Sequence, residues 1–122
     1  MKKKVIMIAG GGTGGHIYPG IAIARALQKA DPSVEIRFVG TEKGLETKIV
    51  PREGFALHLI YGGQLNFPGE PLKKIKTLLR LPVGIFQSLE LLIKYRPYFV
   101  LGVGGYASGP FVLLASLLGC RT

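Results

Sequence analysis

VIMIAGGGTGGH (residues 5–16) joins a short apolar run to five glycines and a histidine. The run at 4–9 is typical of a buried strand, and 18–30 carries apolar residues at the spacing of a helix. Glycine loses more backbone entropy on folding than any other residue, so five glycines this close together indicate a turn that needs bare backbone. We therefore predict a strand, a glycine turn and a helix at the start of the fold.

Strand-like and helix-like segments continue to alternate along the chain. Further strands are expected at 34–39, 56–61 and 98–101, and further helices at 42–50, 72–81, 83–95 and 111–118. The two middle helices are divided at Pro82, because proline disfavours the helical conformation of the residue before it. This order predicts an α/β fold, a doubly wound parallel sheet of the Rossmann-like type. Because no strand follows the last helix, we expect 1–122 to be one domain truncated before its fifth strand.

The composition limits the class of protein. A chain of 122 residues, 48% of them hydrophobic, has room for one core and is not disordered. Its 16 Lys and Arg against 7 Asp and Glu give a net charge of +9, which favours an anionic partner such as phosphate, acidic lipid or nucleic acid. A solvated basic surface has the same composition. The single cysteine, Cys120, excludes an internal disulfide and favours a reducing compartment, where it is expected to be a core residue.

Two segments resemble membrane signals. Residues 1–9 begin like a signal peptide, but the apolar run is shorter than a signal peptide needs. Residues 97–120 carry no charge until after Cys120 and are long enough to cross a bilayer. Glycine and proline interrupt the middle of this segment, at Gly102, Gly104, Gly105, Gly109 and Pro110. A strand, a loop and a helix suit that pattern better than one continuous helix, so we expect no transmembrane span.

The first glycine turn is interpreted as a phosphate-binding turn. In parallel α/β sheets, ligands bind beyond the carboxyl ends of the strands. Glycines let backbone N–H groups approach an anion, and the following helix contributes its positive N-terminal dipole. A tight turn without a ligand is the alternative.

Known nucleotide-binding motifs match this turn poorly. Gly10, Gly12 and Gly15 satisfy G-x-G-x-x-G, but a run this rich in glycine satisfies it almost automatically. The acid that a dinucleotide site requires would be Glu42, which also suits the first turn of a helix. A P-loop is excluded, because His16 and Ile17 stand where lysine and a hydroxyl residue are required. With one aspartate in the chain, no Asp-x-Asp metal site exists, and we expect no metal ligand.

A second glycine turn follows the fourth predicted strand. Residues 101–110 read LGVGGYASGP. The topology brings its Gly104, Gly105, Tyr106 and Ser108 to the same sheet edge as Thr13 and His16. Two anion-binding turns that face one crevice suit a ligand with a diphosphate linkage.

GGTGGHIYPGIAIA at 11–24, with GVGGYASGP at 102–110, resembles the MurG family of bacterial N-acetylglucosaminyltransferases. The resemblance covers essentially the whole chain and identifies it as the amino-terminal, acceptor-side half of a GT-B glycosyltransferase. It implies inverting transfer of N-acetylglucosamine from UDP-GlcNAc to lipid I, which forms lipid II in peptidoglycan synthesis, without a cofactor. The UDP-GlcNAc would bind a carboxyl-terminal domain absent from this chain, so this fragment alone is expected to be inactive.

The resemblance also implies a set of site residues. The acceptor pyrophosphate and sugar would be held by Gly12, Thr13, Gly14, Gly15, His16, Gly104, Gly105, Tyr106 and Ser108. His16 is the candidate general base, because its ordinary pKa suits proton transfer near neutral pH. Its alternative role is to cap the helix or to hydrogen-bond the acceptor phosphate. His58 lies in an apolar strand and is interpreted as structural.

Residues 71–86 (PLKKIKTLLRLPVGIF) interleave apolar and basic side chains. Such a segment can lie on an anionic membrane surface. The expected contacts are Leu72, Lys73, Ile75, Lys76, Leu79 and Arg80. The alternative is an ordinary amphipathic helix that packs on the sheet. The resemblance implies a peripheral enzyme on the cytoplasmic face of the bacterial cell membrane.

The chain departs from the family pattern in two places. Residues 62–71 differ from the Ser-Gly-Leu-Arg-Gly type of loop expected there, and a His-Glu-Gln-Asn motif is absent. Two other functions stay open at this point, a noncatalytic membrane-side subunit that recruits a separate donor-binding chain and a dinucleotide-binding domain. Nucleic acid is not an expected partner, because the basic residues lack interleaved aromatic side chains.

Overall fold

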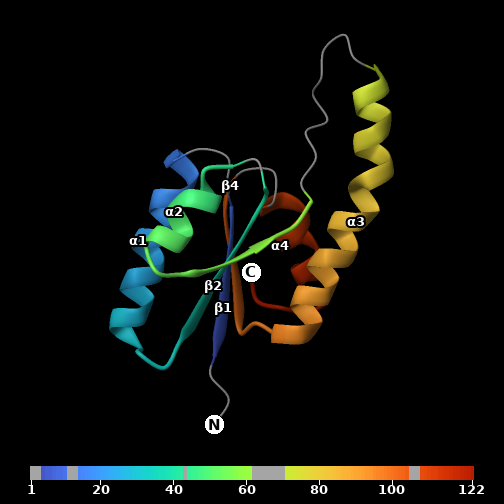
Figure 1. Ribbon diagram of the computed structural model, residues 1–122. Helices are drawn as coiled ribbons and strands as arrows, with labels where there is room; N and C mark the ends of the chain where they lie inside the picture. The colour runs from blue at the N-terminus through green and yellow to red at the C-terminus, as the bar shows by residue number, and fades with distance from the viewer. Residues whose placement is uncertain (1–3, 11–13, 43, 62–70, 105–107) are drawn as a thin grey trace.

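The computed structural model describes residues 4–10, 14–42, 44–61, 71–104 and 108–122, with backbone alone for 14–16 and 71–81. Four parallel strands form one sheet in the order β3-β2-β1-β4. The strands are β1 (Val5–Gly10), β2 (Glu35–Gly40), β3 (Ala56–Leu59) and β4 (Phe99–Gly104). The helices are α1 (Gly14–Ala30), α2 (Glu46–Arg52), α3 (Pro71–Tyr95) and α4 (Ser108–Leu117). The predicted doubly wound parallel sheet is confirmed (Figure 1).

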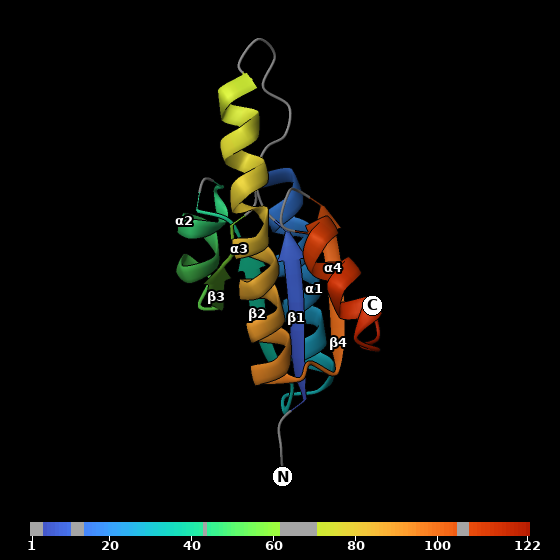
Figure 2. The same ribbon diagram turned by 90° about the vertical axis from the view of Figure 1, so that its right-hand side faces the viewer.

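Helices cover both faces of the sheet. α1 and α2 lie on one face, and α3 and α4 lie on the other (Figures 1 and 2). β1 contributes alternate residues to the two cores: Ile6 and Ile8 pack toward α1, whereas Met7 and Ala9 pack toward α3 and α4. Because both faces of β1 are buried, its sequence is a continuous apolar run rather than an alternating one.

The first helix begins at Gly14 rather than at residue 18 as predicted, so Gly14, Gly15 and His16 form its first turn. Gly14 and Gly15 can start the helix because the N–H groups of a first turn need no hydrogen-bond partner within the helix. Pro19 lies inside α1 rather than in the first turn. Its fixed φ is compatible with a helix, and its missing N–H removes only one hydrogen bond.

The prediction of two helices divided at Pro82 is wrong. α3 is continuous over 25 residues with Pro82 inside it. The exposed proline costs one backbone hydrogen bond locally, whereas the carboxyl-terminal half of the helix is held by core packing through Ser88 and Leu92. No helix among the described residues combines the length and the hydropathy that a membrane span requires.

Four further boundaries also differ from the predicted ones. The second helix begins at Glu46, so Glu42 is an exposed residue after β2 and not a first-turn residue. β3 ends at Leu59, two residues early, whereas β4 continues to Gly104. α4 begins at Ser108 instead of residue 111. Beyond α4 the chain returns to the free edge of β4, where the carbonyl of Arg121 accepts a hydrogen bond of 2.8 Å from Val100 N–H.

Candidate functional site

The two glycine turns leave the sheet at neighbouring points of one edge. β1 and β4 are adjacent and parallel, and Gly10 pairs with Gly104 after a shift in register. α1 begins four residues after Gly10, and α4 begins four residues after Gly104. The N-termini of two helices therefore lie beside each other at the carboxyl edge of the sheet (Figure 1). The strand ends and helix starts that flank the two turns are therefore neighbours, whereas 11–13 and 105–107 themselves lie outside the described residues.

The predicted site residues divide into two groups. Gly14, Gly15 and His16 begin α1, and Gly104 and Ser108 flank the second turn. The others lie outside the described residues, namely Gly12, Thr13, Gly105 and Tyr106. The roles assigned to all of these residues remain predictions.

Close backbone packing explains glycine at the end of each strand. A Cβ on Gly10 would lie 2.4 Å from Cγ2 of Val103 and 3.0 Å from the carbonyl oxygen of Gly104. Gly104 itself has a φ of 112°, which side chains of L residues rarely adopt. The two strand ends can approach this closely only because both lack a side chain.

Ser108 is buried at the start of α4. It is 9% exposed, and its hydroxyl faces Gly102, where an added Cβ would lie 2.4 Å from Oγ. An anion at this edge would therefore meet the backbone N–H groups of the first turn of α4 more readily than the hydroxyl.

A buried carboxylate that the sequence did not predict, Glu46, lies beside the end of β2, the strand next to β1. Glu46 is 1% exposed. Its Oε1 accepts hydrogen bonds from the Thr41 backbone N–H at 2.8 Å and from the Thr41 hydroxyl at 3.1 Å. The sequence offers Glu42 only as the acid of a dinucleotide site or as a first-turn helix residue, and Glu42 is exposed. The glycines at 40 and 44 on either side of Thr41 were the available signal, because they leave room for a side chain to fold back.

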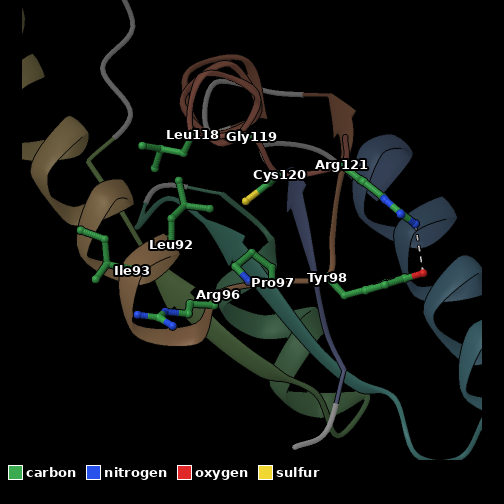
Figure 3. A pocket seen from close by; sticks show the side chains of 9 residues that line it. All are labelled: Leu92, Ile93, Arg96, Pro97, Tyr98, Leu118, Gly119, Cys120 and Arg121. Atoms are coloured by element: carbon green, nitrogen blue, oxygen red, sulfur yellow. Dashed lines mark hydrogen bonds between the residues drawn. The ribbon is translucent and has the colours of Figure 1, made fainter.

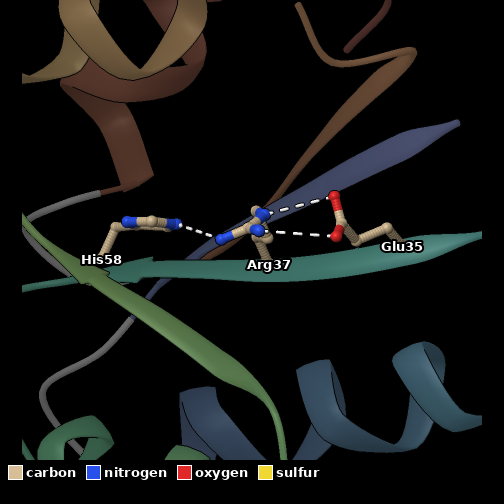
Figure 4. A network of polar contacts seen from close by, with 3 residues as sticks. All are labelled: Glu35, Arg37 and His58. Carbon is tan, nitrogen blue, oxygen red and sulfur yellow. Dashed lines mark hydrogen bonds and ion pairs between the residues drawn. The ribbon is translucent and has the colours of Figure 1, made fainter. Parts of the chain in front are cut away.

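His58 belongs to a polar network on the α3 face of the sheet (Figure 4). Its Nε2 lies 3.0 Å from Nη1 of Arg37, whose other nitrogens contact the carboxylate of Glu35 at 3.3 and 3.4 Å. The Tyr95 ring packs on the imidazole, with 5.1 Å between centroids. Burial, and then the positive charges of Arg37 and Lys94, lower the pKa of His58. Because neutral His58 accepts from Arg37 and packs on α3, its interpretation as structural agrees with these contacts.

Two pockets are lined by described residues, and both lie away from the glycine edge. One of about 580 Å³ lies at the opposite, amino-terminal edge, between the last turn of α3 and the residues that follow α4 (Figure 3). Arg121 donates to the Tyr98 hydroxyl at its rim, at 3.1 Å. The second, of about 300 Å³, lies beside His58 and Tyr95. Parallel sheets bind ligands at their carboxyl ends, so the topology favours the glycine edge over either pocket.

The first half of α3 extends beyond the sheet and the other helices in both views (Figures 1 and 2). This half contains Leu72, Lys73, Ile75, Lys76, Leu79 and Arg80, whose side chains lie outside the described residues. Immediately after it, three apolar side chains are exposed: Val83 by 49%, Ile85 by 51% and Phe86 by 70%. Exposed apolar side chains therefore follow directly after the segment for which the sequence predicts membrane contact.

Comparisons with known protein families and sequences find relatives of this chain. A model of the glycosyltransferase family 28 N-terminal domain matches residues 6–122. A protein of Bdellovibrio bacteriovorus named UDP-N-acetylglucosamine--N-acetylmuramyl-(pentapeptide) pyrophosphoryl-undecaprenol N-acetylglucosamine transferase is 69% identical over 98% of this chain. A protein of Myxococcus xanthus with the same name is 45% identical over 96% of it. The chain spans about a third of the length of these relatives, 33% and 30% respectively.

Solved structures show the same fold. The crystal structure of Acinetobacter baumannii MurG superposes with a TM-score of 0.72 and 27% identity, over 96% of this chain and 33% of that one. The Streptomyces glycosyltransferase SsfS6 superposes with a TM-score of 0.63 over 96% of this chain and 37% of its own, but is only 18% identical. The second match supports the fold alone. Both place the four-stranded sheet among the amino-terminal domains of GT-B glycosyltransferases.

Proposed function

This chain belongs to glycosyltransferase family 28, and from that premise we propose that it is the acceptor-binding, amino-terminal domain of an inverting N-acetylglucosaminyltransferase. The complete enzyme would move N-acetylglucosamine from UDP-GlcNAc to lipid I and form lipid II. Because the chain spans about a third of its relatives, the UDP-GlcNAc site is assigned to a further domain. The name of the relative that is 69% identical supports this reaction.

The observation that carries the proposal is the pairing of Gly10 with Gly104 at one sheet edge. It sets the N-termini of α1 and α4 side by side, and each N-terminus presents unpaired N–H groups and a positive dipole. A diphosphate carries its charge on two linked centres, so two adjacent turns can each hold one phosphate. The net charge of +9 favours the same anionic ligand.

We assign His16 as the general base that accepts the proton of the attacking sugar hydroxyl. Its backbone lies in the first turn of α1, next to the proposed diphosphate. The alternative role, a hydrogen bond to an acceptor phosphate, predicts a different kinetic effect. Loss of a general base lowers kcat, whereas loss of a ground-state contact raises the acceptor KM.

The first half of α3 is proposed to rest on the cytoplasmic face of the bacterial cell membrane. Its interleaved lysines and apolar residues, and its extension beyond the sheet, support this placement. A lipid-linked acceptor would then reach the glycine edge without leaving the bilayer. The enzyme is accordingly a peripheral membrane protein in this account.

The test uses the full-length protein with His16→Ala and, separately, Tyr106→Ala. Release of UDP in the presence of lipid I is measured for each variant. We expect His16→Ala to lower kcat by about 10²-fold or more, as for loss of a general base. We expect Tyr106→Ala to raise the KM for lipid I, because the tyrosine belongs to the acceptor-side turn.

His58→Gln is the matched control, since it replaces the other histidine of the chain, which lies on β3, two strands away from β1. It should release UDP at the wild-type rate. Wild-type kinetics in both His16→Ala and Tyr106→Ala would refute the site assignment. A wild-type protein that transfers nothing to lipid I would refute the reaction itself.

A further inference from the structure

Glu46 is a buried carboxylate that has no role in the proposed reaction. A charged side chain this deeply buried requires hydrogen-bonding partners to offset its lost hydration. Thr41 supplies two of them, its backbone N–H and its hydroxyl, to the same oxygen. One side chain therefore fixes both the backbone and the side chain of the first residue after β2.

Gly40 and Gly44 lie in close contact with the side chain of Glu46. A Cβ added to Gly40 would lie 2.5 Å from Cγ of Glu46. A Cβ added to Gly44 would lie 1.8 Å from Oε2. Gly40 and Gly44 thus enclose the carboxylate on two sides, and neither glycine can be replaced without moving it.

Gly40 and Thr41 lie at the carboxyl edge of the sheet. β2 is parallel to β1, and Val39 pairs with Ala9, so the two strands reach Gly40 and Gly10 at the same level. Thr41 therefore follows the strand directly beside the one that carries the first glycine turn. Ligands of parallel sheets are bound by the loops of neighbouring strands at this edge.

We propose that Glu46 is a positioning residue for the acceptor, which it serves by holding Thr41, at the end of β2, as a wall beside the end of β1. The inference rests on the proposed function, because it assigns the acceptor to the first glycine turn. Glu46 contacts no reacting atom in this account. Its carboxylate keeps the wall in one conformation, so that the sugar next to the diphosphate is received in one orientation.

The test compares Glu46→Ala and Glu46→Gln in the full-length protein, with KM measured separately for lipid I and for UDP-GlcNAc. Glu46→Ala should raise the KM for lipid I by about tenfold, because both Thr41 donors lose a charged acceptor. The KM for UDP-GlcNAc should stay at its wild-type value. Glu46→Gln keeps an oxygen for Thr41 and should recover most of the loss.

Glu53→Ala is the control, since it removes an acid at the other end of α2 whose partner is Arg25. It should leave both KM values unchanged. If Glu46→Ala fails to fold, Thr41→Val against Thr41→Ser tests the same pair, with the higher KM for lipid I expected in the valine variant. An unchanged KM for lipid I in Glu46→Ala or Thr41→Val, or an equal rise for both substrates, would overturn the inference. The wild-type reaction would still support the proposed function in that case.

Discussion

His58 holds its hydrogen bond to Arg37 in a setting that penalises a second positive charge. Because its folded-state pKa lies below the ordinary 6.5, the unfolded chain takes up this proton more readily than the folded one. Stability linked to His58 is therefore fully present above pH 6.5 and is lost as the pH falls from there through the folded pKa.

We predict that His58→Gln reduces the acid sensitivity of the fold. The amide keeps an acceptor for Arg37 but does not titrate, so the Tm of the variant should fall less than the wild-type Tm between pH 7 and pH 5. Thermal unfolding of the full-length protein, followed by circular dichroism across this range, measures the difference. Parallel Tm curves for the two proteins would show that His58 contributes nothing to the acid response.

Gly10 offers a second test at the residue scale. Gly10→Ala places a Cβ 2.4 Å from Cγ2 of Val103, and such overpacking typically costs about 1–3 kcal/mol. Val103→Ala removes the methyl group that is struck. The two substitutions should therefore be less than additive in the free energy of unfolding, measured in urea. Strict additivity would mean that the strand ends do not pack as described.

Local pattern was enough to predict a need for glycine at the ends of β1 and β4, but not the burial of Glu46. The residue type at positions 10 and 104, glycine, itself indicates that the fold requires backbone without a side chain there. The burial of Glu46 depends on where Gly40, Thr41 and Gly44 lie in space, and Glu42, four residues earlier, is exposed. The choice between two nearby acids is made by tertiary packing, which no short window of sequence contains.

Among the elements, α3 is held to the end of β3 by contacts near its middle. The Tyr61 backbone N–H donates to Oε1 of Gln87 at 2.7 Å. A Cβ on Gly84 would lie 2.2 Å from the carbonyl oxygen of Tyr61. Glycine at this position therefore allows the helix to approach the strand, and the half of α3 that precedes Pro82 extends away from this junction.

We expect Gly84→Ala to destabilise the fold by about 1–3 kcal/mol, because a backbone carbonyl cannot rotate out of the way as a side chain can. Gly109→Ala in α4 is the matched control, since an added Cβ there meets nothing within 4 Å. Alanine at 109 should be neutral or stabilising by up to about 1 kcal/mol. Equal urea midpoints for the two variants would contradict the close contact between α3 and β3.

The order of the elements could be predicted, but several of their ends could not. Alternating apolar runs and helical spacing set the order of strands and helices. The prediction for α3 was wrong at Pro82. The local free-energy cost of one proline is smaller than the free energy gained by packing the turns that follow it. β4 was predicted too short, because Gly102 and Gly104 weaken a strand pattern even where pairing with β1 extends the strand.

At the scale of the whole molecule, we expect binding to anionic membranes to depend on the basic residues of one segment, the first half of α3, rather than on the net positive charge alone. We predict that Lys73→Glu combined with Lys76→Glu lowers binding of the full-length protein to anionic vesicles by at least about tenfold, since each basic residue near such a surface contributes about 1 kcal/mol. Lys29→Glu combined with Lys48→Glu changes the net charge equally at exposed sites on α1 and α2. Co-sedimentation with vesicles containing phosphatidylglycerol measures both, and equal losses would assign binding to overall charge alone.

The central claim of the proposed function is that two turns at one sheet edge hold the diphosphate of a lipid-linked acceptor. The most direct measurement is a crystal structure of the full-length protein with a short-chain analogue of lipid I. We predict phosphate oxygens within about 3.2 Å of backbone nitrogens at the start of α1 and in the turn between β4 and α4. A diphosphate bound elsewhere on the protein, with both turns facing away from it, would contradict the central claim.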